Sequence, residues 1–262
     1  NIKGTSNYED TKDSDVIIIT AGVPRKPGMS RDDLLAINLK IIKQVSEGIK
    51  TTSPEAFVIC ITNPLDVIVS ALQKYTNFKH NKVVGMAGIL DTSRFIFFLS
   101  EHLGVETSKI KSFVLGGHGD SMVAMLNHTY IDGKPISELV KNGKLKKDKL
   151  DFIINRTKNG GAEIVKFLEK GSAFYAPASS GVEMADSYLN NRKKQLPCAA
   201  FLNGEYGVKS LYVGVPVIIG SNGVEKVIEI DLSPTEKENF NKSIDSVKKL
   251  YEAAIKIDST LK

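Results

Sequence analysis

The sequence predicts an α/β fold, in which a doubly wound parallel sheet is followed by an α+β region. Two observations lead to this prediction. Short apolar runs without charge, such as Val16–Thr20 and Ala56–Ile61, alternate with stretches of helical periodicity as far as about Gly88. This alternation is typical of buried parallel strands joined by crossover helices. From about Asp91 onward the alternation stops, and strands follow strands instead.

The first predicted unit consists of a strand, a loop and a helix. Val16–Thr20 is β-branched and apolar on both faces, as a central strand is. The glycines and prolines of residues 21–30 disfavour both helix and strand. Ser30 can cap a helix whose first turn carries Asp32 and Asp33 and whose apolar residues recur at helical spacing.

The second unit repeats the first. We expect a strand at Ala56–Ile61, a loop at Thr62–Pro64, a helix at Leu65–Tyr75 and a third, shorter strand at Lys82–Gly85. Parallel strands of one sheet are joined by right-handed crossovers. Ligands of such sheets bind beyond the carboxyl ends of the strands, so polar residues in the loops that follow the strands are candidates for chemistry.

The region after Asp91 is predicted to be α+β. Its expected strands are Ile110–Leu115, Met122–Ile131 and a strand-rich part from Leu196 to Ile230, with a hairpin turn at Ser221–Gly223. Its expected helices are Asp91–Leu103, Lys146–Lys158, Gly161–Glu169 and a closing helix that starts at the capping box Ser233–Glu236 and runs through Lys256. We therefore expect two domains, residues 1–88 and residues 89–262.

Composition and charge argue against several classes of function. The apolar stretches are far shorter than the roughly 20 residues of a membrane helix, and residues 1–15 lack the apolar core of a secretory signal. We therefore expect no membrane contact and a cytoplasmic protein. Cys60 and Cys198 stand alone, which favours neither a disulfide framework nor a metal site. The net charge of +5 permits nucleic-acid binding, but the dense basic cluster Lys141–Lys149 has no interleaved aromatic residues and favours a solvated lysine face.

Three polar residues in loops or at helix starts suggest the reduction of a carbonyl group. Hydride transfer to a carbonyl carbon leaves an alkoxide, and histidine is the side chain that titrates near neutrality and can protonate it. His118 follows a predicted strand and is flanked by glycines. Asp91 and Arg94 are three residues apart, so they share one helix face. The aspartate can favour the protonated histidine, and the arginine can bind a substrate carboxylate.

Six strings in the sequence resemble, in order and spacing, those of the lactate/malate dehydrogenase family. They are ITAGVPRKPGMSR (Ile19–Arg31), ITNPLD (Ile61–Asp66), GMAGILDTSRF (Gly85–Phe95), GGHGD (Gly116–Asp120), GSAFYAPASS (Gly171–Ser180) and YVGVPVIIG (Tyr212–Gly220). The pattern is most similar to that of the lactate-dehydrogenase-like bacterial malate dehydrogenases. This resemblance implies a dinucleotide-binding (Rossmann) domain in residues 1–88 and a catalytic domain in residues 89–262. It further implies an NAD-dependent enzyme of the tricarboxylic acid cycle, assembled as a homotetramer or homodimer.

The resemblance also implies a role for individual residues. His118 would donate and accept the proton, with Asp91 as its carboxylate partner. Arg94 would bind the C1 carboxylate of the substrate, Arg31 would polarise the carbonyl oxygen, and Asn63 would hydrogen-bond to substrate and active-site groups. Contacts to the cofactor are expected from Thr20, Ala21, Gly22, Asn38, Ile61, Thr62 and Asn63.

Arg25 determines the expected substrate class. Relatives that act on lactate usually carry glutamine at this loop position, whereas an arginine supplies a positive charge for the second carboxylate of a dicarboxylate. A monocarboxylate would leave that charge unpaired in a closed site, which is costly. The expected reaction is therefore the reversible oxidation of (S)-malate to oxaloacetate, with L-lactate oxidation as the enzymatic alternative.

The G-x-G-x-x-G turn that binds the pyrophosphate of dinucleotides does not occur in the sequence. By comparison with the family, we expect the chain to begin inside the Rossmann domain and to lack roughly its first two or three strands. The choice of NAD over NADP is inherited from the resemblance, because the acidic residue that binds the ribose would lie in that part. An alternative of another class is a non-catalytic, truncated nucleotide-binding subunit, against which the retention of all the catalytic residue types argues.

Overall fold

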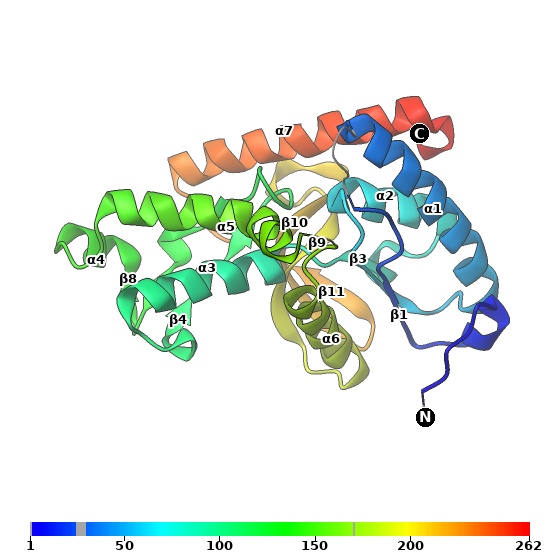
Figure 1. The fold of residues 1–262 in the computed structure, drawn as a ribbon, viewed down its shortest axis with the longest axis horizontal. Coiled ribbons are helices and arrows are strands. Elements are labelled where there is room, and N and C mark those ends of the chain that lie inside the picture. Colours follow the sequence, from blue (N-terminus) through cyan, green and yellow to red (C-terminus); the bar gives the residue numbers. More distant parts are fainter. Residues whose placement is uncertain (1, 25–29, 170) are drawn as a thin grey trace.

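The protein has the expected α/β architecture (Figure 1). The structure, a computed structural model, describes residues 2–24, 30–169 and 171–262, apart from the side chain of Arg31. The helices are α1 (Arg31–Thr52), α2 (Leu65–Thr76), α3 (Gly88–Leu103), α4 (Ile136–Lys141), α5 (Lys147–Leu168), α6 (Tyr175–Leu189) and α7 (Pro234–Ile257). The strands are β1 (Val16–Ile19), β2 (Phe57–Cys60), β3 (Val83–Gly85), β4 (Ile110–Lys111), β5 (Val114–Leu115), β6 (Val123–Ala124), β7 (Tyr130–Ile131), β8 (Lys134–Pro135), β9 (Lys194–Asn203), β10 (Lys209–Gly220) and β11 (Gly223–Val227).

The main sheet of the described residues has the strand order β1-β2-β3-β9-β10-β11. β1, β2 and β3 pair in parallel, as the alternation of strands and helices predicts. β9 then joins β3 through an antiparallel pair between Gly85 and Ala199, and β9, β10 and β11 continue as an antiparallel meander. Residues before and after position 88 therefore share one hydrogen-bonded sheet.

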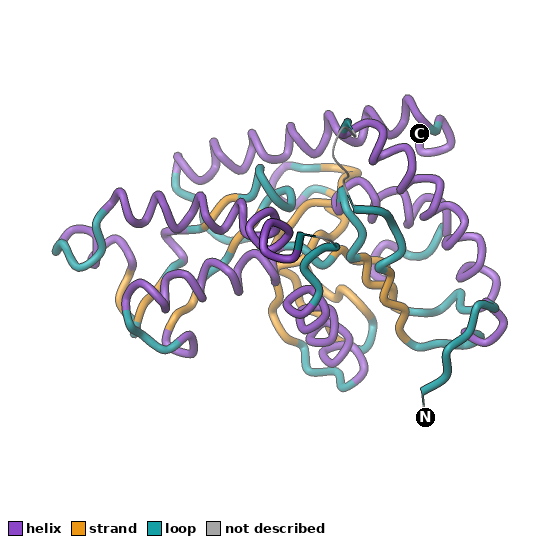
Figure 2. Tube along the Cα trace, in the orientation of Figure 1, coloured by secondary structure: helices purple, strands orange, loops and turns teal. Residues whose placement is uncertain are grey.

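Helices cover both faces of this sheet (Figure 2). Side chains alternate along β2, so that Phe57 and Ile59 belong to one buried cluster and Val58 and Cys60 to another. The second cluster packs under α1, α2 and the C-terminal half of α7, whereas α6 packs over the first. A third cluster, between α3, α5 and the short strands β4 and β7, forms the core of a separate lobe.

The predicted N-cap at Ser30 and the predicted capping box at Ser233–Glu236 are confirmed and explain where their helices begin, and the cap at Ser30 is itself a capping box. Ser30 Oγ accepts a hydrogen bond from the amide of Asp33 at 3.0 Å, and the Asp33 carboxylate accepts one from the amide of Ser30 at 3.1 Å. Ser233 and Glu236 form the same reciprocal pair at the start of α7, with Pro234 in the first turn. The hairpin turn between β10 and β11 also lies where the sequence predicts it.

Several other predictions were wrong in detail. The expected strands Ile110–Leu115 and Met122–Ile131 are each divided into two short strands that pair in different sheets, because the chain changes direction between them. The two helices expected over Lys146–Lys158 and Gly161–Glu169 are the single helix α5, in which the glycine pair does not interrupt the helical hydrogen bonding.

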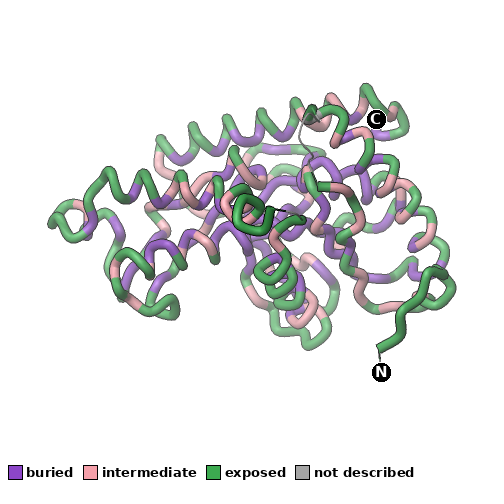
Figure 3. The backbone as a smooth tube through the Cα atoms, in the orientation of Figure 1, coloured by how far each residue is buried: buried purple, intermediate pink, exposed green. Residues whose placement is uncertain are grey.

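Helices α4 and α6 were not predicted from the sequence. Apart from Met184, the inward face of α6 is made of small or polar residues, namely Pro177, Ser180, Gly181 and Ser187, so the helix shows little apolar periodicity. Burial is concentrated in the sheet and in α2, most of whose residues are buried (Figure 3). Among the described residues, no helix combines the length and the apolar character that a membrane span requires.

Candidate active site

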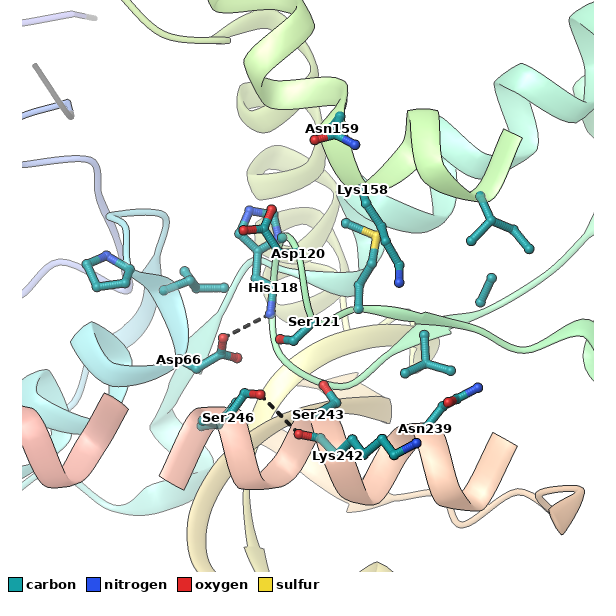
Figure 4. A pocket seen from close by; sticks show the side chains of 18 of the residues that line it. Asp66, His118, Asp120, Ser121, Lys158, Asn159, Asn239, Lys242, Ser243 and Ser246 are labelled. Atoms are coloured by element: carbon teal, nitrogen blue, oxygen red, sulfur yellow. Dashed lines mark hydrogen bonds between the residues drawn. The ribbon is translucent and has the colours of Figure 1, made fainter. Parts of the chain in front are cut away.

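A cavity of about 1420 Å³ lies between the start of α2, the loop after β5, and helices α5 and α7 (Figure 4). Its lining includes Asn63, Asp66, Arg94 and His118. The first two follow the carboxyl end of β2, which is where the sequence predicts a ligand site. The structure thus brings together residues that lie far apart in the chain.

His118 and Asp91 form the hydrogen-bonded pair that the sequence analysis expects. Nδ1 of His118 lies 2.8 Å from Oδ2 of Asp91. Asp91 is 1% exposed in the first turn of α3. The histidine sits in a loop in which Gly116 and Gly119 have φ angles of 87° and 89°, values that side chains other than glycine rarely adopt. Because Asp91 holds Nδ1, the other ring nitrogen, Nε2, is the one left for a ligand.

The charges around His118 favour its protonated form. Burial on its own would lower the pKa of His118, but the charge and hydrogen bond of Asp91 and the charge of Asp66 together raise that pKa above its ordinary value. Arg94 acts in the opposite direction and lowers it. The balance leaves a histidine that holds its proton more firmly than a free imidazole does.

Arg94 has unused hydrogen-bonding capacity beside this pair. Its guanidinium is 3.8 Å from Oδ1 of Asp91, beyond hydrogen-bond distance, and its side chain is 12% exposed. Within the described part of the chain, neither Nε of Arg94 nor Oδ1 of Asp91 has a hydrogen-bond partner. Burial lowers the pKa of Arg94, and Asp91 partly offsets this effect. A buried guanidinium with free donors fits an incoming carboxylate.

Gly160 of α5 provides the space that Arg94 occupies. A Cβ atom at Gly160 would lie 3.1 Å from Cδ and 3.3 Å from Nε of Arg94. At the adjacent Gly161, a Cβ atom would meet nothing within 4 Å. The prediction of two helices divided at this glycine pair was wrong, since α5 continues through it. Gly160 instead allows close contact between α5 and Arg94.

Asp66 and Ser243 also contact the histidine loop, Gly116–Asp120. Neither residue was predicted from the sequence to have a role. The backbone amide of His118 donates to Oδ2 of Asp66 at 2.9 Å, and the amide of Gly117 donates to Oγ of Ser243 at 2.8 Å. Asp66 lies within the ITNPLD string, in a helix whose other residues in the first turn are apolar. An acidic residue among apolar residues at the start of a helix could have indicated a functional role for Asp66. The sequence holds no comparable signal for Ser243, which lies 126 residues from Gly117.

The residues expected to contact the cofactor lie together where the loops after β1 and β2 meet. The Asn38 side chain bonds to the amide of Val23 at 2.8 Å and to the carbonyl oxygen of Asn63 at 2.7 Å. Thr62 Oγ1 donates to the carbonyl oxygen of Ala21 at 2.8 Å. Both side chains therefore tie the two loops to each other.

The remaining residues of this group are at least partly open to solvent. Thr20, Gly22 and Asn63 are exposed, while Ala21 and Ile61 are half-buried. A Cβ atom at Gly22 would lie 2.6 Å from Cγ2 of Thr62, so only glycine fits there and the backbone stays open to close approach. An exposed glycine turn beyond parallel strands suits a dinucleotide.

Two predicted site residues cannot be placed in this cavity. Arg25 lies outside the described residues. Arg31 is the first residue of α1, but its side chain lies outside the description as well. In the ranges that the structure covers, no group of three or more His, Cys, Asp or Glu residues is arranged to hold a metal ion.

The fold and the site together define a dehydrogenase. A histidine held by a buried carboxylate can exchange a proton with an oxygen atom, and a neighbouring arginine can hold a carboxylate of the same molecule. The loops at the carboxyl ends of parallel strands are the place where a dinucleotide binds in such folds. A proton site, an anion site and an exposed glycine turn at the ends of parallel strands are the parts that the NAD-dependent oxidation of a hydroxy acid requires.

Comparisons with known proteins identify the family. Residues 1–85 match the NAD binding domain of lactate/malate dehydrogenase, and residues 89–257 match its alpha/beta C-terminal domain. The chain belongs to the lactate/malate dehydrogenase family, and it is an NAD-dependent 2-hydroxy acid dehydrogenase.

Curated relatives and solved structures agree with this assignment. The chain is 66% identical over 258 residues to a malate dehydrogenase of Pelagibacter ubique (strain HTCC1062), covering 98% of the chain and 81% of the relative. It is 56% identical over 260 residues to a malate dehydrogenase of Caulobacter vibrioides (strain NA1000 / CB15N), covering 99% and 81%. The crystal structure of Cryptosporidium parvum malate dehydrogenase superposes with a TM-score of 0.93 at 47% identity, covering 97% of this chain and 81% of that chain. A lactate dehydrogenase of the same organism, complexed with lactic acid and nicotinamide adenine dinucleotide, gives 0.92 at 45% identity, covering 96% and 79%.

Proposed function

We propose that this protein is a malate dehydrogenase that catalyses the reversible, NAD-dependent oxidation of (S)-malate to oxaloacetate in the tricarboxylic acid cycle. The observation that carries the proposal is the pairing of His118 with Asp91 at 2.8 Å, with Arg94 lining the same cavity. Support also comes from the relatives at 66% and 56% identity, both of which are named malate dehydrogenase.

In the direction of reduction, His118 gives its proton to the carbonyl oxygen of the substrate. Asp91 holds Nδ1–H, so the proton leaves from Nε2. Arg94 binds the C1 carboxylate through the donors that have no partner in the described part of the protein. The buried carboxylate of Asp91 stabilises the imidazolium before transfer, and in malate oxidation it supports proton uptake by the ring.

The bound NAD would supply or accept the hydride at the substrate carbon. The Thr20–Gly22 turn and Ile61 and Asn63 would contact it, and Asn38 and Thr62 would position these loops through the hydrogen bonds described above. Asn63 would also contact the substrate. The fit of glycine alone at position 22 supports this assignment.

The choice of malate over lactate depends on Arg25. Structures of both malate and lactate dehydrogenases superpose closely on this chain, so the fold does not separate the two substrates. Arg25 would bind the second carboxylate of a dicarboxylate, and Arg31 would polarise the carbonyl oxygen as charge develops on it. In the sequence, Arg25 falls between β1 and α1, and Arg31 is the first residue of α1.

Residues 1–88 would serve the cofactor and residues 89–262 the substrate, in a cytoplasmic homotetramer or homodimer. Exposed apolar side chains on and beside α6 support self-association. Tyr175 is 82% exposed, Phe167 is 76% exposed, and Val182 and Leu189 are each more than half exposed. Large apolar side chains gathered on a surface favour protein contact.

Oxidation of NADH with oxaloacetate and with pyruvate tests the assignment. We expect faster turnover with oxaloacetate, and we expect Arg25→Gln to move the preference toward pyruvate, because it removes the partner of the second carboxylate. Preference of the unmodified protein for pyruvate would instead establish the lactate alternative. Binding of NADH without turnover of either substrate would support a non-catalytic nucleotide-binding subunit.

A further inference from the structure

The histidine loop is fastened to two helices by consecutive backbone amides. The amide of Gly117 donates to Ser243 on α7. The amide of His118 donates to Asp66 on α2 (Figure 4). The loop has little freedom here, because a Cβ atom at Gly117 would lie 2.6 Å from Oγ of Ser121 and 2.8 Å from Cγ2 of Val247. The two acceptors differ in one respect: Ser243 is neutral and Asp66 is a carboxyl group.

Asp66 lies in an unusual environment for a carboxylate. The residue is 7% exposed, and its neighbours Leu65 and Val67 are at most 1% exposed. Its Oδ2 atom accepts the hydrogen bond from His118, whereas Oδ1 has no partner among the described residues. A merely structural acceptor for one amide could be neutral, as Ser243 is. A buried charge is costly unless it interacts with another charge.

We propose that Asp66 is a second positioning carboxylate for His118, which holds the backbone of the histidine and adds negative charge that favours the imidazolium. This inference rests on the proposed function of His118 as the proton donor. Asp91 binds the ring directly, and Asp66 acts from the other side through the backbone and through space. The two carboxylates together outweigh the effects of burial and of Arg94.

The protonation of Asp66 and that of His118 are coupled. Burial raises the pKa of Asp66 to about 6, although the amide and the charge of His118 lower it, and the charge of Asp91 raises it further. The charge of Asp66 in turn raises the pKa of His118. As pH falls through about 6, Asp66 becomes neutral and its support for the imidazolium is lost. Such a pair titrates in coupled steps.

The other charged groups around Asp66 come from several elements. Asp91 and Arg94 belong to α3, and His118 and Asp120 belong to the loop. Helix α7 contributes Lys242 and Lys249 to the wall of the same cavity, and Lys242 is paired with Glu238 at 2.6 Å. Helix α5 contributes Lys158 and Asp151, and Asp32 lines the cavity from α1. Of these groups, His118 donates a hydrogen bond to Asp66 from its backbone amide.

Three variants separate the charge of Asp66 from its hydrogen bond. Asp66→Asn keeps an oxygen acceptor and removes the charge. Ser243→Ala removes the neighbouring acceptor without a change in charge. Asp245→Asn is the control: it makes the same chemical change as Asp66→Asn, but at an exposed site on α7. The measurement is kcat/KM for malate oxidation as a function of pH, in which His118 must be neutral to accept the proton.

We expect Asp66→Asn to move the acid limb of the profile to lower pH, because a weaker field lowers the pKa of His118. Ser243→Ala should lower kcat on the order of two- to tenfold, as the loss of one hydrogen bond does, and leave the limb in place. Asp245→Asn should change neither kcat nor the position of the acid limb. An unmoved limb in Asp66→Asn, or an equal shift in Asp245→Asn, would contradict the proposal.

A titration of the unmodified protein by NMR gives a test that depends neither on turnover nor on the folding of a variant. The Cε1–H signal of His118 is identified by its absence in His118→Asn. Its chemical shift should show a second inflection at a pH of about 6, where Asp66 titrates. A single inflection overturns the role of Asp66. Absence of malate turnover would overturn the proposed function instead, and the NMR result would still decide whether the two groups interact.

Discussion

Oδ2 of Asp91 lies 2.8 Å from Nδ1 of His118, which joins the first turn of α3 to the glycine loop after β5. The two residues are 27 positions apart in the chain. This contact fixes which ring nitrogen carries the proton that is not transferred. It also places a buried negative charge against the ring that would be positive in the proposed mechanism.

Asp91→Asn is expected to lower kcat for oxaloacetate reduction on the order of 10² to 10⁴, because the amide neither stabilises the imidazolium nor selects the correct tautomer. Steady-state oxidation of NADH checks this value. His118→Asn should lose activity to a similar extent, and both variants should bind NADH as the unmodified protein does. Activity of Asp91→Asn within threefold of the unmodified enzyme would show that the contact has no catalytic role.

The pH dependence of the two directions should be opposite. Reduction needs protonated His118 and oxidation needs the neutral ring. Because the pKa of His118 is raised, reduction should persist above the ordinary pKa of histidine and decline as pH rises through the raised value. Oxidation should increase over the same interval. Initial rates of both directions across the pH range check this, and a decline of reduction below the ordinary histidine pKa would count against it.

Gly160→Ala and Gly161→Ala form a matched pair in α5. The first places a methyl group 3.1 Å from Cδ of Arg94, so the guanidinium must move and the C1 carboxylate should bind more weakly. We expect KM for oxaloacetate to rise on the order of tenfold, as the weakening of a charge-assisted hydrogen bond predicts.

Gly161→Ala is the control, since a methyl group there meets nothing within 4 Å. It should leave KM unchanged and stabilise the protein by roughly 0.5 to 1 kcal/mol, the helix preference of alanine over glycine. Kinetics and urea unfolding measure the two effects. Equal KM values for both variants would show that Gly160 does not position Arg94.

Asp258 ties the end of α7 to two other helices. Its carboxylate accepts hydrogen bonds from Nζ of Lys43 and from the hydroxyl of Tyr75, each at 2.9 Å. The side chain of Thr260 and then Lys43 hold the pKa of Asp258 below its ordinary value. A lowered pKa means that the stabilisation is present above the pKa of the unfolded chain and is lost as pH falls through the folded value.

Asp258→Asn should therefore lower the free energy of unfolding by about 1 kcal/mol at neutral pH, the usual contribution of a partly exposed charged hydrogen bond. The difference from the unmodified protein should shrink in acid. Urea unfolding at both pH values measures it. The control Asp245→Asn, whose carboxylate is 4.0 Å from Lys248, should change stability by less than about 0.5 kcal/mol. If the loss of unfolding free energy caused by Asp258→Asn were larger in acid than at neutral pH, the predicted direction of the pH dependence would be wrong.

Some elements were predictable because their signals are local. Ser30 and Ser233 cap helices through contacts three residues away, and the apolar run Phe57–Cys60 is recognisable as a buried strand. Val16–Ile19 forms the expected strand, but the prediction of a central, buried strand was wrong, because β1 lies at one end of the strand order of the described sheet and is only partly buried. Helix α6 was not predictable in this way, since its inward residues other than Met184 are small or polar. Its burial depends on the sheet beneath it.

The residue types of the site and the elements that carry them follow from local sequence, including a histidine among glycines and an aspartate and arginine on one helix turn. The tertiary structure was needed to show that Asp66 and Ser243, 52 and 126 residues away from their partners, hold the histidine loop. It also placed β9 beside β3. Such contacts follow from the packing of α2 and α7 around one sheet, which depends on long-range burial rather than on any local pattern.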